Sequence, residues 1–152
     1  MDSQFTIVIA DDHPLFRGAL YQAVHMAIKD AQLLEADSIN SLTSLLGEHP
    51  EVDLLLLDLK MPGANGFSGL AHLRGQYPDL PIVVVSASED AAIIQQVLRL
   101  GALGFIPKSV PMKELVNALN TVIGGDNWVP AGISLHPESE DGPDFASKLA
   151  SL

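Results

Sequence analysis

The chain has no cysteine among its 152 residues. This absence excludes disulfide bonds and every zinc site that depends on thiolate ligands. Basic residues are scarce too, because 8 Lys and Arg stand against 19 Asp and Glu, for a formal net charge of −11. So acidic a balance argues against direct nucleic-acid binding by this segment, and it permits a basic partner surface or a bound cation.

Long apolar runs are absent as well, and the longest falls far below the ~20 residues that a membrane-spanning helix needs. The first four residues carry no basic group ahead of the apolar stretch that follows, which argues against a signal peptide. At 47% hydrophobic residues the chain can still bury a sizeable core. We therefore expect a cytoplasmic protein that makes no contact with membranes.

What the sequence does contain is a regular alternation of short apolar runs and helical patterns. The runs predict β-strands at residues 5–10, 32–36, 52–57, 82–86 and 103–106, and the patterns predict helices at residues 14–28, 39–47, 66–76, 90–100 and 112–124. This alternation indicates an α/β fold with a parallel sheet and helices on both faces. In the first helix we expect Leu15, Ala19, Val24 and Ile28 to face the core.

The character of the chain changes after residue 126. Residues 136–144 are polar and acidic and include two prolines, which is typical of a linker. We therefore assign residues 1–126 to one domain and residues 127–152 to an acidic linker. From the residues alone, a linker to a second domain and a simple tail are both open.

Charged residues follow three of the predicted strands. Asp58 comes directly after four leucines, Asp11 and Asp12 follow the first apolar run, and Lys108 follows the last one. Parallel strands bring their carboxyl ends to one edge of the sheet, so these groups should meet there. Clustered carboxylates repel one another unless a cation neutralises them, and oxygen ligands suit Mg²⁺. The pattern predicts divalent-cation and phosphoryl-transfer chemistry.

Ordinary explanations exist for each residue taken alone. Asp12 could cap the helix that starts at Pro14, Ser86 could cap the helix after the fourth strand, and a lone Lys108 is usually a solvated surface lysine. Their joint placement at one sheet edge favours the functional interpretation, in which Ser86 and Lys108 contact a phosphoryl group.

Four segments taken together resemble the receiver domain of two-component response regulators over about residues 5–126. They read IVIADDHPLFR, LLLLDLKMPGANG, IVVVSAS and LGALGFIPKS. The DDHPLFR and GFIPKS stretches look most like the NarL/LuxR (FixJ-like) subfamily. The resemblance implies a doubly wound, flavodoxin-like (βα)5 sandwich of three layers, with a parallel five-stranded sheet of order 2-1-3-4-5. It also implies that the acidic linker leads toward a helix-turn-helix DNA-binding domain that this sequence does not contain.

The resemblance makes Asp58 the phosphoacceptor. Asp11, Asp12 and Asp58 would hold Mg²⁺ (or Mn²⁺) together with the backbone carbonyl of Lys60. The phosphoryl donor would be a sensor histidine kinase or a phosphotransfer domain. By this interpretation the chain catalyses only its own phosphorylation and dephosphorylation, and it is not an enzyme that acts on an external substrate.

The resemblance also implies how the signal is read. Ser86 and Lys108 would bind the phosphoryl group, and Phe105, at a position where tyrosine is frequent, would turn inward as Ser86 moves. The affected surface would be the fourth helix, fifth strand and fifth helix. A homodimer would form through that surface or through the first and fifth helices, and DNA would be contacted only through the absent C-terminal domain, to control transcription.

Three rival functions are weighed against this one. A phosphatase of the haloacid dehalogenase type needs an Asp-x-Asp spacing that Asp11-Asp12-His13 lacks. A flavodoxin-like cofactor binder needs a Ser/Thr/Gly-rich phosphate loop after the first strand, where this chain has an acidic one. A degenerate receiver would act only as a protein-interaction module, and a phosphorylation assay separates it from an active one.

Overall fold

The computed structural model of the chain describes residues 5–133. Strands and helices alternate without exception along this part of the chain, which confirms the predicted α/β class. In chain order the elements are β1 (Thr6–Ala10), α1 (Pro14–Ala27), β2 (Gln32–Ala36), α2 (Ile39–Glu48), β3 (Leu54–Asp58), α3 (Phe67–Gln76), β4 (Ile82–Ser86), α4 (Ala91–Arg99), β5 (Gly104–Pro107) and α5 (Met112–Ile123).

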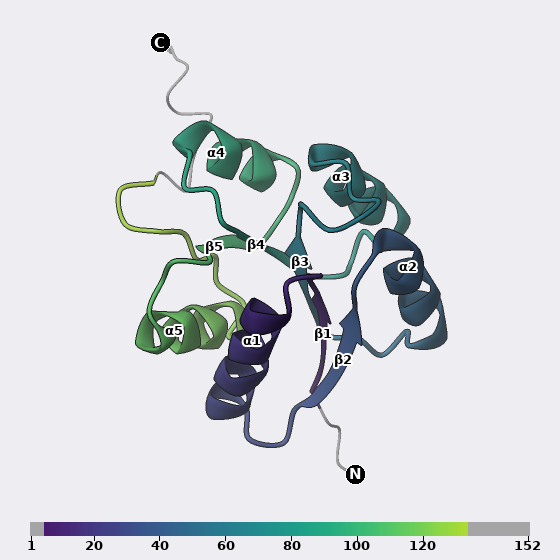
Figure 1. Cartoon of the computed structure of the whole chain (residues 1–152), viewed down its shortest axis with the longest axis horizontal. Coiled ribbons are helices and arrows are strands. Elements are labelled where there is room, and N and C mark those ends of the chain that lie inside the picture. Colours follow the sequence, from purple (N-terminus) through teal and green to yellow (C-terminus); the bar gives the residue numbers. More distant parts are fainter. Residues whose placement is uncertain (1–4, 134–152) are drawn as a thin grey trace.

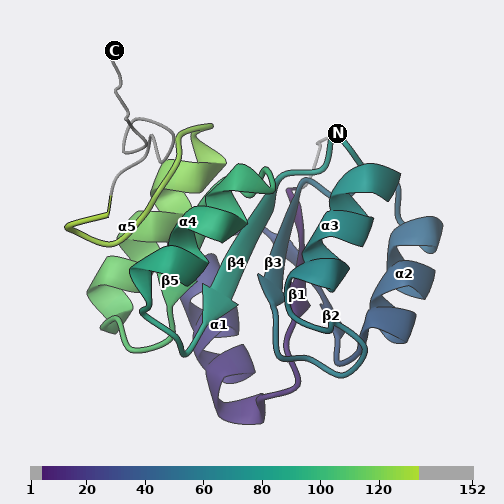
Figure 2. The ribbon, with the colours of Figure 1, turned by 90° about the horizontal axis from the view of Figure 1, so that it is seen from above.

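The five strands form one parallel sheet in the order β2-β1-β3-β4-β5, as predicted. Helices α1 and α5 cover one face of the sheet, and α2, α3 and α4 cover the other (Figure 1). Figure 2, turned by 90°, shows the same three layers from above. None of the helices within residues 5–133 is long and apolar enough to cross a membrane.

The central strands read as continuous apolar runs because both of their faces are covered. Every residue of β1, β3 and β4 is buried. Successive side chains point to opposite faces of the sheet, so Leu55 and Leu57 join the core beneath α2, α3 and α4, whereas Leu54 and Leu56 join the core beneath α1 and α5. A two-sided core of this kind is what the four leucines before Asp58 require.

The buried face of α1 differs from the prediction. Leu15 is 84% exposed, and the fully packed positions are Phe16, Leu20, Ala23 and Val24. These four are spaced by four, three and one residues, which is the stripe that a helix turns toward its core. Leu15 lies one position, or about 100° of helix rotation, away from Phe16 and so points to solvent. The prediction was wrong for Leu15 and right for Val24, and Ala19 and Ile28 pack against the same core as partly buried residues.

The helix starts test the capping explanations offered above for Asp12 and Ser86. Ser38 caps α2 through a reciprocal pair of hydrogen bonds with Ser41, and the Asp90 carboxylate accepts from Ala92 N at 2.9 Å to cap α4. The N-cap of α1 is His13, with no side-chain cap bond, and Pro14 occupies the first turn. Asp12 therefore does not cap this helix, so its carboxylate needs another explanation.

After α5 the chain does not leave the body of the protein at once. Trp128 forms an isolated parallel bridge with Gly104 on the outer edge of β5. The segment predicted as a linker, residues 127–152, therefore begins with residues that pair with the sheet. The rest of that segment, residues 134–152, lies outside the described residues.

Candidate functional site

Four strand ends carry the side chains of the candidate site. Asp58 is the last residue of β3 and Ser86 is the last residue of β4, while Asp11 follows β1 and Lys108 follows β5. The strands run parallel and in register, with Asp58 beside Val85. The topology thus brings residues that are far apart in sequence to one edge of the sheet, as predicted.

Three carboxylates meet at this edge. Asp11, Asp12 and Asp58 each offer an oxygen, and these oxygens all lie within 4.8 Å of one another. Asp11 is completely buried and Asp58 is 3% exposed, whereas Asp12 faces solvent. Because Asp12 is the exposed member of the cluster, a ligand can approach the three carboxylates from its side.

Backbone donors hold one oxygen of each buried acid. The His13 N–H donates to Asp11 Oδ1 at 2.7 Å, and the Lys60 N–H donates to Asp58 Oδ1 at 3.0 Å. The other oxygens face Lys108, whose Nζ lies 3.0 Å from Asp11 Oδ2 and 3.0 Å from Asp58 Oδ2. Each buried carboxylate therefore has one oxygen fixed by the chain and one that points into the site.

The electrostatics of the cluster are unbalanced, because three carboxylates face one ammonium. Burial raises the pKa of Asp11, and the charge of Asp58 adds to that rise, although the His13 N–H and the Lys108 ammonium oppose it. Burial also disfavours the charged form of Lys108, but the two carboxylates outweigh it and raise the pKa of Lys108. Lys108 is therefore firmly protonated, and the excess charge of the cluster is negative.

The residues present fit a divalent cation. Among the described residues, Asp11 Oδ2 is the buried side-chain oxygen for which no hydrogen bond is found, although it forms an ion pair with the Lys108 ammonium 3.0 Å away. An oxygen without a donor is available as a metal ligand, and the ligands on offer are all hard carboxylates, which suit Mg²⁺. The predicted fourth ligand, the backbone carbonyl of Lys60, lies in the loop that follows Asp58 and stays a prediction.

Ser86 lies in the site but its hydroxyl is engaged by its own loop. It is buried, and its Oγ accepts from the Ser88 N–H at 3.1 Å. The Ser88 hydroxyl accepts in turn from the Asp90 N–H at 3.2 Å, so side chains brace the whole β4–α4 loop. A ligand that draws the Ser86 hydroxyl away would therefore disturb this loop.

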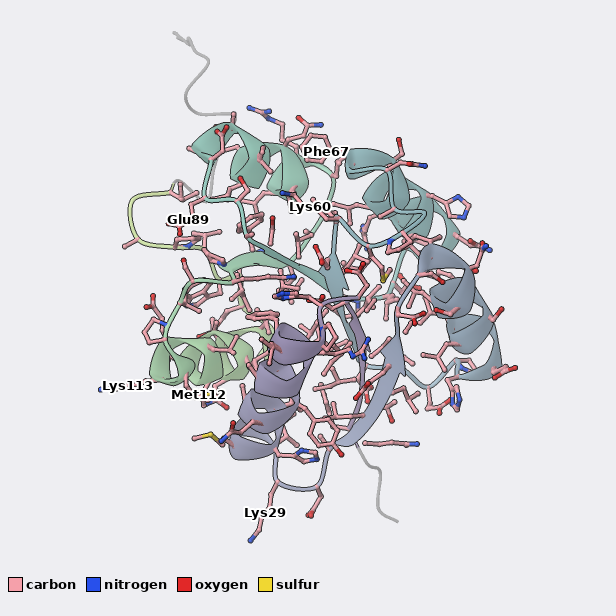
Figure 3. The ribbon with its side chains drawn as sticks, viewed as in Figure 1. Lys29, Lys60, Phe67, Glu89, Met112 and Lys113 are labelled. Carbon is pink, nitrogen blue, oxygen red and sulfur yellow. The ribbon has the colours of Figure 1, made fainter. Side chains whose placement is uncertain are left out.

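The ring of Phe105, the predicted switch residue, is fully buried in the core beneath α2, α3 and α4. It thus occupies an inward position in this structure. The side chain of Lys60 is exposed, and with Phe67 it lines a groove between the loops that follow β3 and β4 (Figure 3). The predicted roles of Phe105 as a switch and of the Lys60 carbonyl as a metal ligand stay predictions.

Sequence reasoning missed two supporting residues. Arg17 Nη1 donates to the backbone carbonyl of Asp11 at 2.9 Å, and Arg17 Nε pairs with Glu35 on β2 at 3.3 Å. The guanidinium therefore ties the acidic loop to the neighbouring strand. Arg17 belongs to the DDHPLFR segment, but nothing in the spacing indicated that its guanidinium bonds the backbone carbonyl of Asp11.

Comparison with known proteins identifies the family of this chain. The family model described as "Response regulator receiver domain" matches residues 7–120. The chain belongs to the response regulator receiver family.

Relatives of this receiver include proteins named as transcriptional regulatory proteins. It is 40% identical over 129 residues to the glycerol metabolism activator of Pseudomonas putida, an alignment that covers 85% of this chain and 58% of that protein. It is 35% identical over 121 residues to the nitrate/nitrite response regulator NarL of Escherichia coli K12, covering 80% of this chain and 56% of the relative. The chain thus spans little more than half the length of the curated relatives that it matches.

Solved structures agree with this assignment. The receiver domain of a NarL from Mycobacterium tuberculosis superimposes with a TM-score of 0.70 at 31% identity, covering 82% of this chain and 99% of that one. RcsB from Salmonella enterica serovar Typhimurium, solved on a promoter with phosphomimetic BeF3⁻, gives a TM-score of 0.78 at 25% identity, covering 92% of this chain and 70% of that one. The predicted resemblance to the NarL/LuxR subfamily is confirmed.

Proposed function

We propose that this receiver accepts a phosphoryl group on Asp58 from a phosphohistidine of a sensor histidine kinase or phosphotransfer domain. The observation that carries the proposal is the position of Asp58, a nearly buried carboxylate whose Oδ2 faces Lys108 Nζ at 3.0 Å in a cluster with Asp11 and Asp12. A carboxylate held this way is an aligned nucleophile, and the cluster around it can balance charge on a phosphoryl group.

The transfer itself is simple in covalent terms. An Asp58 oxygen attacks phosphorus, the phosphorus–nitrogen bond of the donor breaks, and its electron pair returns to the imidazole. A divalent cation held by Asp11, Asp12 and Asp58, with the Lys60 carbonyl, would supply charge neutralisation on the phosphoryl oxygens. Lys108 then moves its contact from the carboxylate to a phosphoryl oxygen, and the Ser86 hydroxyl donates a hydrogen bond to another.

The stored phosphoryl group would act by shifting a conformational equilibrium. Withdrawal of Ser86 from its bond to Ser88 frees the β4–α4 loop, and Lys108 pulls on β5, so both elements have contacts that differ between the two states. The output would be transcription, controlled through a DNA-binding domain, in a cytoplasmic protein. The promoter-bound RcsB neighbour supports that output.

Two further properties belong to the same proposal. The domain would act on no external substrate beyond its own phosphodonor and the aspartyl phosphate that it forms. Two copies would pair through the α4-β5-α5 surface or through α1 and α5, and the second surface carries Tyr21 and Met26 of α1, which are 46% and 60% exposed.

Intact-mass spectrometry after incubation with acetyl phosphate and Mg²⁺ tests the proposal. We expect a gain of about 80 Da, the mass of one phosphoryl group. Asp58→Asn should show no gain, whereas the matched control Asp53→Asn, at the opposite end of β3, should label like the parent chain. Labelling of Asp58→Asn would refute the assignment. An unlabelled parent chain would instead favour a receiver that acts only through protein contacts.

A further inference from the structure

The outer edge of β5 is occupied by the protein's own chain. After α5, residues 126–133, here called the edge segment, run beside β5 before turning toward α4 (Figure 1, yellow-green). The Phe105 N–H donates to the Trp128 carbonyl at 3.1 Å, and Asn127 Nδ2 donates to the Leu103 carbonyl at 2.6 Å. An edge strand would otherwise expose these groups, so the edge segment supplies hydrogen-bond partners to the outer edge of β5.

The sequence of β5 is adapted to this close approach. A Cβ on Gly104 would lie 2.7 Å from the Trp128 carbonyl oxygen, a distance that real Cβ atoms essentially never show. Because the obstructing atom is backbone, it could yield only if the edge segment moved away. Gly104 is therefore the residue that lets Trp128 pair with β5.

The edge segment also contacts both cores. Trp128 packs against the core beneath α1 and α5, whereas Ile133 packs against the opposite core, which contains the ring of Phe105. The segment therefore crosses the edge of the sheet like a strap and has apolar contacts on each side. Its backbone bond to β5 is made by the predicted switch residue itself.

A short path joins this edge to Asp58. Lys108 directly follows β5, and its Nζ bonds Asp58 Oδ2 at 3.0 Å. The Lys108 N–H donates to the Ser86 carbonyl at 2.7 Å, so β5 is tied to the β4–α4 loop as well. Only Ile106 and Pro107 separate Lys108, which contacts Asp58, from Phe105, which bonds Trp128.

We propose that the outer edge of β5 is the docking surface for the edge segment, and that a phosphoryl group on Asp58 releases the segment from it. When Lys108 follows the phosphoryl oxygens, β5 shifts relative to Trp128, and a single 3.1 Å backbone bond has little tolerance for such a shift. The edge segment, which connects the receiver to the residues that follow it, thereby loses its attachment to the sheet. This inference rests on the proposed function.

The single tryptophan of the chain makes the release measurable. With Mg²⁺ and beryllofluoride, a phosphoryl mimic, we expect the emission of Trp128 to shift to longer wavelength and its quenching by acrylamide to increase. By NMR-detected amide exchange, the Phe105 N–H should exchange several-fold faster. Asp58→Asn should show neither change.

Two variants separate docking from chemistry. Gly104→Ala should expose Trp128 and speed Phe105 exchange before any ligand is added, with no further change on beryllofluoride. Asn127→Ala, which removes one bond and adds no atoms, should give the same result to a lesser degree and guards against misfolding of the first variant. Gly75→Ala, where a Cβ meets nothing within 4 Å, is the matched control.

The intact mass of the protein distinguishes failure of the release from failure of the proposed phosphorylation. If Asp58 gains a phosphoryl group while Trp128 emission and Phe105 exchange stay unchanged, the coupling is refuted and the proposed function stands. If Asp58 gains nothing, both fail together. Undisturbed Trp128 emission in Gly104→Ala would show that β5 is not the docking surface.

Discussion

The two halves of the site are built differently. The acid half comprises the ends of β1 and β3, and both strands lie inside the sheet with hydrogen-bonded neighbours on each side. The readout half comprises the ends of β4 and β5, and β5 is an edge strand whose outer side is covered by Trp128. Both acid strands therefore lie inside the sheet, whereas one of the two readout strands, β5, lies at its edge.

The supports of the two halves differ as well. In the acid half, backbone N–H groups hold Asp11 and Asp58, and Arg17 clamps the loop from behind. In the readout half a backbone N–H likewise holds the Ser86 hydroxyl, but Ser109 is held by a bond between two exposed side chains, which water could replace. The arrangement separates a fixed place for chemistry from a movable place for signalling, as a switch needs.

Lys108 is the side chain that joins the halves, so its loss should have the largest effect. Lys108→Met leaves Asp11 and Asp58 buried without their counter-charge, and we expect a loss of about 3–5 kcal/mol in the free energy of unfolding without metal. Urea denaturation measures this, and Mg²⁺ should restore part of the loss. The exposed Lys113→Met is the control, and equal midpoints for both variants would contradict the role of Lys108.

Arg17 tests whether the acid half owes its order to the clamp behind Asp11. Arg17→Ala removes the bond to the Asp11 carbonyl, and we expect Mg²⁺ to bind about tenfold more weakly, as when other outer supports of a metal site are lost. Isothermal titration measures the affinity. Arg99→Ala, an exposed change on α4, should leave it unchanged, and a normal affinity in Arg17→Ala would show that the loop is ordered without the clamp.

Asp11 tests the cost of concentrating charge in the acid half. Asp11→Asn removes one repelling carboxylate, so the metal-free protein should gain about 1 kcal/mol, the usual size of a single-residue effect. In the parent chain, burial raises the pKa of Asp11 above 3.8. As the pH falls through that folded-state value, the folded chain takes up a proton before the unfolded chain does, and the contribution of Asp11 to stability rises.

Urea denaturation across this acidic range checks the prediction. The stability of Asp11→Asn should lack the rise, and the stabilisation that Mg²⁺ gives at neutral pH should be reduced. A variant that is less stable than the parent without metal would show that the Lys108 pair outweighs the repulsion.

Ser109 tests the readout half and should have the smallest effect. Its hydroxyl donates to the Glu89 carboxylate at 2.6 Å and so links the loop after β5 to the loop after β4. Glu89, in the loop after β4, is labelled in Figure 3. Both side chains are exposed, so Ser109→Ala should cost about 0.5 kcal/mol. Glu89→Gln keeps an acceptor and should cost less. A loss like that of Lys108→Met would mean that this half is as rigid as the other.

The sheet was predictable because the composition of its central strands, which are continuous apolar runs, indicates that they are buried on both faces. A run such as Leu54–Leu57 has no polar alternation, so it could only be covered on both faces, and the charge at Asp58 then had to lie at a strand end. The joint position of Asp11, Asp12 and Lys108 followed from the same topology. These inferences need only the order of the elements, and the structure confirms the placement.

Other features could not be predicted because they depend on distances that no local pattern encodes. The phase of α1 was misjudged at Leu15, since two neighbouring apolar residues compete for one buried position and packing chose Phe16. The clamp of Arg17 on Asp11 joins two residues only six apart, yet its partner Glu35 belongs to another strand. The docking of Trp128 rests on one bridge and a few separate contacts, and these follow no periodic pattern in the sequence.

The distance in sequence between Asp58 and Lys108 has a consequence for folding. They are 50 residues apart, and all three acids precede residue 59. A chain made from its N-terminus completes β1 and β3 before β5 exists, so the carboxylates can gather while their counter-charge is still unmade. Until β5 docks, a divalent cation could take the place of the Lys108 ammonium beside these carboxylates. The ion proposed to assist phosphoryl transfer would then also assist the folding of the nascent chain.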